Sequence, residues 1–214
     1  MGASSAWSRP VRTITLPASR EDVASLELGE MVTLTGPIVV TAGIPTHHRI
    51  IEHIRSSTPT PIALNDTAFF HLGSYSRETE NGFEILYMNP TTSTRFNALM
   101  PEIIRHFNLR CVGGKGGLDD ECARALRDVG GVYLSFLGGG APILSAAIRK
   151  IRHVAWDDFI SHYRLVELEV EALGPLTVAI DARGNSLYRN LDDGAAQKRA
   201  AILEQLAQRR TTGQ

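Results

Sequence analysis

The hydrophobic pattern of the chain changes from alternation to helical spacing and back to alternation. Alternating apolar and polar residues predict half-buried strands, and apolar residues three or four apart predict amphipathic helices. We therefore expect strands over 11–16, 31–41 (two strands with a turn at Gly36-Pro37), 68–72, 84–88, 109–112, 132–136, 165–170 and 176–181, and helices starting at 19 and over 47–55, 99–107, 119–129, 141–151 and 195–210. Helices and strands alternate in the middle of this order, which predicts an α/β fold.

The length of 214 residues is enough for one domain with a real core. The hydrophobic content of 43% and the charged content of 21% are ordinary for a globular protein. We expect a flexible N-terminal tail over 1–10, a single domain over 11–192, and a C-terminal helix and tail over 193–214.

Charge and hydropathy exclude several classes of partner. The chain has 22 Lys plus Arg against 23 Asp plus Glu, a formal net charge of -1, so no global field favours nucleic acid or an anionic membrane. We find no apolar run of membrane-spanning length, and the first ten residues lack the core of a secretory signal. We expect a cytoplasmic protein, with Cys111 and Cys122 as reduced thiols and Cys111 in the core.

Lys115 lies between two glycine pairs in the segment 112–117. A phosphate loop needs Ser or Thr after the lysine, where this chain has Gly116, and a dinucleotide fingerprint needs a third glycine where it has Asp119. Two interpretations are left. Lys115 is a solvated lysine in an ordinary turn, or backbone N–H groups and its ammonium converge on an anion at the start of a helix.

A second polar cluster follows the strand expected at 84–88. Thr91, Thr92 and Ser93 carry hydroxyls, and Arg95 carries a guanidinium that can hold a carboxylate with two hydrogen bonds. The hydroxyls can equally cap a helix while the arginine pairs with an acid. If the cluster is a site, it binds a small organic acid together with Lys115.

Other reactive residues give weaker signals. His47 and His48 are neighbours on an expected helix, where they point about 100° apart, and no third ligand stands at a recognisable spacing, so we expect no metal site. Ser93 and Ser135 lack the glycine-flanked elbow of a hydrolase nucleophile.

Taken in order, several segments resemble the β subunit, or C-terminal domain, of the class I fumarase and L(+)-tartrate dehydratase family of iron-sulfur hydro-lyases. The resemblance covers roughly residues 26 to 188 and is carried by 28–36, Pro90-Thr91-Thr92-Ser93-x-Arg95, Gly114-Lys115-Gly116-Gly117-Leu118, Gly138-Gly139-Gly140-Ala141, Ala155-Trp156-Asp157-Asp158, 168–171 and 179–188. It implies a swivelling β/β/α domain with mixed sheets and helices packed on one side.

The resemblance also implies a division of labour between two polypeptides. In this family a four-iron, four-sulfur cluster is held by three cysteines of the α part, over which the β part closes. The two cysteines of this chain fit neither that number nor that place. The resemblance therefore implies a hetero-oligomer with a cluster-bearing α subunit, in which this chain ligates no metal and is inactive alone.

Positions matching the family's motifs supply the expected site. Thr91 matches the threonine that moves a proton next to the substrate carboxylate, Arg95 the carboxylate clamp and Lys115 a second anion-binding group. We expect Thr91 and Lys115 to be catalytic, and the following residues to bind substrate: Arg95, Thr92, Ser93, Gly114, Gly116, His48 and Arg49.

One departure concerns the substrate. Family members have Gly-Arg-Asp where this chain reads Gly43-Ile44-Pro45, so Ile44 replaces an arginine that holds the second carboxylate. Either His47, His48 or Arg49 substitutes for that arginine, or the substrate is not fumarate, malate or tartrate, and a hydrophobic group lies at that end.

The sequence thus predicts the β subunit of a heteromeric hydro-lyase acting on a small 2-hydroxy acid. A rival hypothesis is a non-catalytic carboxylate-binding or regulatory subunit that kept the fold, for which Ile44 is the main argument. A third is the small swivelling subunit of an aconitase-like isomerase, which shares the architecture but not these motifs.

Overall fold

The computed structural model describes residues 11–80 and 82–211, so the flexible tail expected at 1–10 lies outside the described residues. The strands are β1 (Arg12–Thr15), β2 (Met31–Val40), β3 (Ala68–Phe70), β4 (Leu72–Thr79), β5 (Gly82–Pro90), β6 (Cys111–Gly114), β7 (Val132–Ser135), β8 (Ile148–Ala155) and β9 (Leu165–Ile180). The helices are α1 (Arg20–Ala24), α2 (Ile44–Arg55), α3 (Met100–Phe107), α4 (Asp120–Val129), α5 (Ala141–Ala146) and α6 (Leu187–Thr211), with the 3₁₀ helices η1 (Ser93–Phe96) and η2 (Ser161–Tyr163).

The main sheet closes on itself. Its seven strands have the order β1-β2-β3-β6-β7-β9-β8, and β2, β3, β6 and β7 run parallel to one another. The long strand β9 pairs antiparallel with β7 and also with β2. The strands β2, β3, β6, β7 and β9 therefore form a ring with an inner and an outer face.

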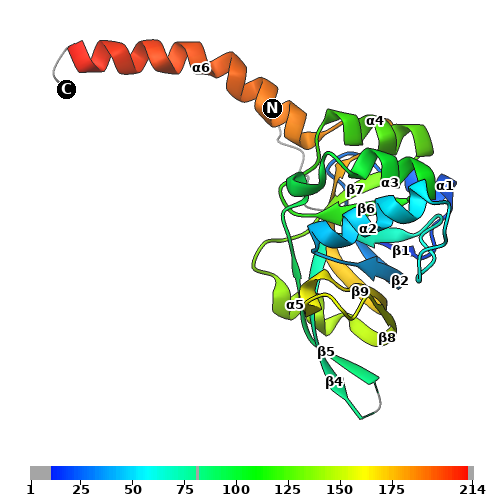
Figure 1. Cartoon of the computed structure of the whole chain (residues 1–214). Helices are drawn as coiled ribbons and strands as arrows, with labels where there is room; N and C mark the ends of the chain where they lie inside the picture. Colours follow the sequence, from blue (N-terminus) through cyan, green and yellow to red (C-terminus); the bar gives the residue numbers. More distant parts are fainter. Residues whose placement is uncertain (1–10, 81, 212–214) are drawn as a thin grey trace.

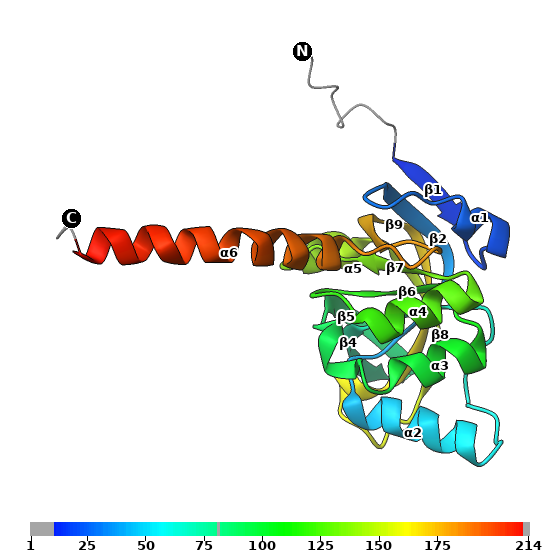
Figure 2. The same cartoon turned by 90° about the horizontal axis from the view of Figure 1, so that it is seen from above.

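Two hydrophobic cores follow from this closure. In β2 and β3, Val40 and Phe70 belong to one buried cluster, whereas their neighbours Val39 and Phe69 belong to the other. Successive strand residues point to opposite faces, so the first cluster fills the ring and the second lies outside it. The helices α2, α3 and α4 cover the second cluster (Figures 1 and 2). The expected fold class, mixed sheets with helices packed on one side, is confirmed.

The turn expected at Gly36-Pro37 is wrong, because β2 is one continuous strand. Gly36 has φ +127, and a Cβ there would lie 2.4 Å from the carbonyl oxygen of Leu16. The pairing of β2 with β9 shifts register between Leu34 and Gly36. The irregularity that the sequence signals is thus a bulge within a strand rather than a break between two strands.

The helix expected over 141–151 is also wrong in its second half, since α5 ends at Ala146 and β8 begins at Ile148. Strand β8 pairs with β9, and Arg149 and Arg152 make ion pairs across that pairing with Glu171 and Glu169 at 2.8 and 2.7 Å. For this segment, pairing with the distant strand β9 outweighs the local preference for a helix. The segments expected as strands at 165–170 and 176–181 are joined in the single strand β9.

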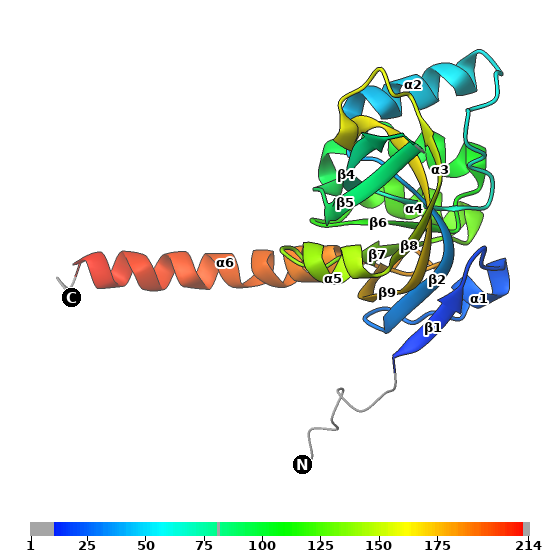
Figure 3. The same ribbon diagram turned by 90° about the horizontal axis from the view of Figure 1, so that it is seen from below.

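Two elements project from the body (Figure 1). Strands β4 and β5 form a separate two-stranded hairpin, although the sequence predicted only its second strand as a clear element. Helix α6 begins at Leu187 rather than at 195 and extends away from the ring (Figure 3).

Both cysteines are buried and free, and Cys111 belongs to the core inside the ring, as expected. Within residues 11–80 and 82–211, no helix is long and apolar enough to cross a membrane.

Close packing inside the ring gives a test of the fold. A Cβ at Gly113 would lie 2.5 Å from the carbonyl oxygen of Leu134 and 2.8 Å from the ring of Phe136. Gly113→Ala should therefore lower the free energy of unfolding by about 1–3 kcal/mol, as overpacked cores do. Urea denaturation measures it.

Gly138→Ala is the matched control, because a Cβ there would meet nothing within 4 Å. Equal stability of the two variants would contradict the ring packing described above.

Candidate carboxylate-binding site

The segments predicted to form the site meet at one edge of the ring. The strands β2, β3 and β6 are parallel, so the residues that follow them, Ile44, His71 and Lys115, lie at the same carboxyl edge. This edge is the usual ligand position in sheets of parallel strands.

Backbone hydrogen bonds join the two polar clusters there. The N–H of Lys115 donates to the carbonyl of Thr91 at 3.0 Å, and the N–H of Ser93 donates to the carbonyl of Lys115 at 2.8 Å. Thr92 and Lys115 form an isolated parallel bridge. The N–H of Thr91 also donates to the carbonyl of His71 at 2.9 Å. Segments more than 20 residues apart in the chain thus hold one another in register.

Arg95 completes this arrangement. It is exposed on η1, and its Nη2 donates a short hydrogen bond to the hydroxyl of Thr91. The next residue, Phe96, is fully buried and anchors η1 to the outer core. The structure therefore brings together Thr91, Arg95 and Lys115, with the Arg95 guanidinium accessible to solvent.

Two of the expected binding glycines have distinct structural roles. A Cβ at Gly114 would lie 2.3 Å from the Ser93 hydroxyl and 3.1 Å from the Thr91 carbonyl oxygen, so only glycine lets these segments approach. Gly116 is exposed and has φ +77, a left-handed conformation that favours glycine. Gly114 is thus a packing position, and Gly116 shapes the turn that presents Lys115.

A buried polar network lies behind the site. The hydroxyl of Tyr133 donates to Ser93 Oγ at 2.8 Å, and Ser93 Oγ lies 2.8 Å from His71 Nδ1. His71 Nε2 lies 3.4 Å from the sulfur of Met100. Burial lowers the pKa of His71 well below its usual value and raises that of Tyr133, so both stay neutral. Since Ser93 is fully buried and its hydroxyl is engaged twice, it positions the site from within.

His47 is the inward-facing member of the histidine pair. Its Nδ1 lies 2.6 Å from the carbonyl of Gly43, while its buried Nε2 has no hydrogen-bond partner. The ring stacks on Phe96 with centroids 4.0 Å apart and lies 5.2 Å from the ring of His71. Burial lowers the pKa of His47 to about 4. His47 is a neutral core residue that packs α2 against η1.

His48 and Arg49 lie on α2, not on the loops that carry Thr91, Arg95 and Lys115. His48 is exposed on α2. Arg49 makes a two-pronged ion pair with Asp158 at 2.8 and 2.7 Å and stacks over Phe159 at 3.9 Å. That pairing leaves the Arg49 guanidinium committed to another loop.

The sequence analysis missed His71 and Tyr133. His71 follows the apolar run 68–70 directly, and a histidine at the carboxyl end of a buried strand is a signal that could have marked it. Tyr133 had no such signal, because an aromatic residue within an apolar strand is ordinary core. Only the pairing of β6 with β7 places it behind Ser93.

Within residues 11–80 and 82–211, no group of three or more His, Cys, Asp or Glu side chains could hold a metal ion. Burial raises the pKa of Cys111 to about 12 and also raises that of Cys122, so neither is a ready thiolate ligand.

Comparison with known proteins identifies the family of this chain. The family model described as Fumarase C-terminus matches residues 3–191, nearly the whole ring and its flanking elements. The chain belongs to this family.

Among relatives, the L(+)-tartrate dehydratase subunit beta of Escherichia coli K12 is 29% identical over 197 residues, 92% of this chain and 96% of its own length. A protein of Methanocaldococcus jannaschii, provisionally named as the same subunit, is 34% identical over 181 residues, 84% of this chain and 92% of its own. A provisionally named class I fumarate hydratase of Geobacillus stearothermophilus is 30% identical over 203 residues, 94% of this chain but only 38% of its own length. The fumarase C-terminal module thus occurs among these relatives both as a chain of similar length and as part of a longer one.

The buried histidines give a prediction on pH. Folding buries His47 in its neutral form, with a pKa of about 4 against 6.5 for the exposed group, so only the unfolded chain takes up this proton below pH 6.5. The free energy of unfolding should therefore fall as the pH falls from about 6.5 to about 4, by about 3 kcal/mol for this one residue. His71 adds a loss of the same sign.

Chemical denaturation at several pH values measures this slope. His47→Gln should flatten it, whereas His48→Gln, a change at the exposed neighbour, should leave it unchanged. The same slope in the wild type and in His47→Gln would contradict the assignment.

Proposed function

We propose that this chain is the β subunit of a hydro-lyase that adds or removes water on a small 2-hydroxy acid. The observation that supports this most is the backbone register between Thr91–Ser93 and Lys115, which gathers a hydroxyl, a guanidinium and the start of an anion-binding turn at one edge. Relatives named as tartrate dehydratase β subunit and class I fumarate hydratase support the reaction class.

The residues of this chain do not fit the four-iron, four-sulfur cluster implied by the family resemblance. The two cysteines lie on different elements, β6 and α4, and the described residues offer no metal-holding group. We therefore assign the cluster to a separate α subunit, and the active site to the junction of the two subunits. The roles proposed below are those of this chain alone.

Arg95 is the proposed carboxylate clamp, because its planar guanidinium can donate two parallel hydrogen bonds. Thr91 is the proposed proton-moving group at the carbon next to that carboxylate. A threonine hydroxyl is a weak base, but the hydrogen bond that it accepts from Arg95 stabilises negative charge on its oxygen. Lys115 is the proposed second anion-binding group at the turn after β6.

Ile44 bears on the choice of substrate. It is the first residue of α2, follows β2 at the site's edge, and is 37% exposed. Arg49 is paired with Asp158, which argues against its replacing the family's arginine. We propose that the substrate carries an apolar group, rather than a second carboxylate, at this end.

The alternative is a subunit that binds a carboxylate but catalyses no reaction. The replacement of the family's arginine by Ile44 also favours this alternative. If this chain takes part in catalysis, replacing Lys115 or Thr91 should slow turnover, and if it only binds carboxylates, it should not. Kinetics of the reconstituted enzyme therefore distinguishes the two functions.

Lys115→Ala should lower kcat/KM by about 10–100-fold in the anaerobically reconstituted complex with the α subunit, as expected for losing one charge-assisted contact. Hydration and dehydration of substituted 2-hydroxy acids, followed by absorbance, measure it. Thr91→Val should lower kcat with little change in KM, because the hydroxyl acts in the chemical step.

The matched control is Lys150→Ala, which removes an exposed lysine from β8. Unchanged turnover of both Lys115→Ala and Thr91→Val would favour the non-catalytic subunit. Activity of this chain without its partner would contradict the division of labour.

The substrate hypothesis predicts the effect of restoring a cation. Ile44→Arg should shift the ratio of kcat/KM values toward dicarboxylic acids by about tenfold or more, since a carboxylate gains a charge-assisted partner. Met31→Arg is the control, because Met31 is a similarly exposed residue at the opposite end of β2. An unchanged ratio in Ile44→Arg would show that position 44 does not face the substrate.

A further inference from the structure

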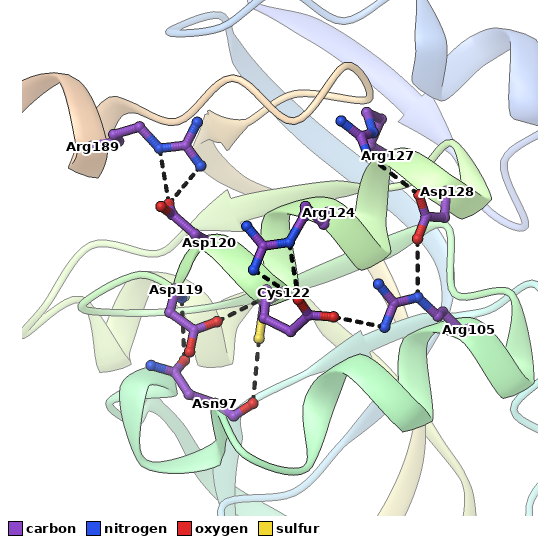
Figure 4. A network of polar contacts seen from close by, with 10 residues as sticks. Asn97, Arg105, Asp119, Asp120, Cys122, Arg124, Arg127, Asp128 and Arg189 are labelled. Atoms are coloured by element: carbon purple, nitrogen blue, oxygen red, sulfur yellow. Dashed lines mark hydrogen bonds and ion pairs between the residues drawn. The ribbon is translucent and has the colours of Figure 1, made fainter.

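Helix α6 is attached to the body through its first turn. Arg189 on its first turn makes an ion pair with Asp120 of α4 at 2.5 Å (Figure 4). Tyr188 packs so close to Gly117 that a Cβ there would lie 2.6 Å from its ring. Beyond these contacts the helix leaves the body and extends from it in all three views (Figures 1, 2 and 3).

The projecting part exposes large apolar side chains. Leu191 is 70% exposed, and Ile202, Leu203 and Leu206 are 50%, 53% and 48% exposed. Most helical stability in proteins comes from tertiary packing rather than from intrinsic propensity, and Gly194 in the interior of α6 lowers that propensity. Packing against another surface would supply the missing stability.

The apolar residues are arranged as a stripe. At about 100° per residue, Leu191, Ala195, Ile202 and Leu206 fall within an arc of about 60° along about four turns. Leu203 lies on the flank of this arc. We call these residues the α6 stripe. The α6 stripe spans an arc of about 120°, and the exposed Lys198 lies at its edge between Ala195 and Ile202.

The charges along α6 indicate what covers the stripe. Asp192 and Asp193 lie near its beginning, while its last turn carries Arg209 and Arg210. If two copies of α6 pair antiparallel about a two-fold axis near residue 201, Asp192 of each lies opposite Arg210 of the other. Ala196 then lies opposite Leu206. Parallel pairing would instead set acid against acid and base against base.

We propose that α6 is an association arm, which pairs antiparallel with α6 of a second copy of this chain through the α6 stripe. The two-fold arrangement makes each contact twice, as in most homodimers. It sets the two bodies at opposite ends of a helix pair about 30 Å long, from the rise of about 1.5 Å per residue. The arm lies almost wholly beyond residue 191, where the match to the family model ends.

Sedimentation velocity of the full chain over a range of concentrations tests this arm without any activity assay. The wild-type chain should sediment as two copies. Ile202→Glu with Leu206→Glu should sediment as one copy, since burial of the stripe is lost and like charges at position 202 face each other across the axis. Gln197→Glu with Ala200→Glu adds the same charge on the opposite side of α6 and should stay dimeric.

A charge exchange checks the antiparallel register. Asp192→Arg with Asp193→Arg should weaken self-association, and so should Arg209→Glu with Arg210→Glu. An equimolar mixture of the two double variants should restore dimers that contain one copy of each.

A monomeric wild type, or a dimer unaffected by Ile202→Glu with Leu206→Glu, would overturn the proposal. The proposal would also be overturned if the stripe variants still formed dimers but no longer bound the α subunit. That result would assign the stripe to the α subunit. Thermal unfolding should show the same body transition in every variant, because the stripe lies outside the ring. Failure of this proposal would leave the proposed hydro-lyase function untouched.

Discussion

The double pairing of strand β9 is the constraint on which the rest of the structure depends. Because β9 pairs with β2 on one edge and with β7 on the other, the parallel strands cannot open into a flat sheet. Closure separates an inner core from an outer one, and α2, α3 and α4 cover the outer one. It also fixes the carboxyl ends of β2, β3 and β6 beside one another, where the polar segments of the chain gather.

The site at that edge stands on a neutral, buried support. Tyr133, Ser93 and His71 form a chain of hydrogen bonds behind Thr91–Arg95, and burial keeps both titrating members uncharged. A positive charge on His71 would compete with the Arg95 guanidinium for the same anion. Neutral groups inside hold the loops, and the cationic Arg95 is exposed outside, where we propose that the carboxylate binds.

The position of the site is consistent with the proposed partner subunit. Arg95 is exposed at the edge rather than enclosed, and no set of metal-ligating side chains lies among the described residues. A water-excluding site would form when another surface covers this edge. The projecting helix α6 begins beside α4, with Tyr188 packed on Gly117 of the turn that presents Lys115, and then extends away from the body.

The sequence by itself determined the α/β class, most helices, and the polar motifs at Thr91–Arg95 and around Lys115, because periodicity and composition are local properties. It indicated the irregularity at Gly36 but not its form, since bulge and turn share the same glycine signal. Strand β8 and the β4–β5 hairpin were decided only by tertiary pairing, and the start of α6 at Leu187 lies where it contacts α4 and Gly117. The tertiary structure alone showed that Ser93 supports the site from within, that Arg49 is paired with Asp158, and that Tyr133 and His71 lie behind the site. These facts depend on contacts between residues far apart in the chain, and local sequence preference carries no information about them.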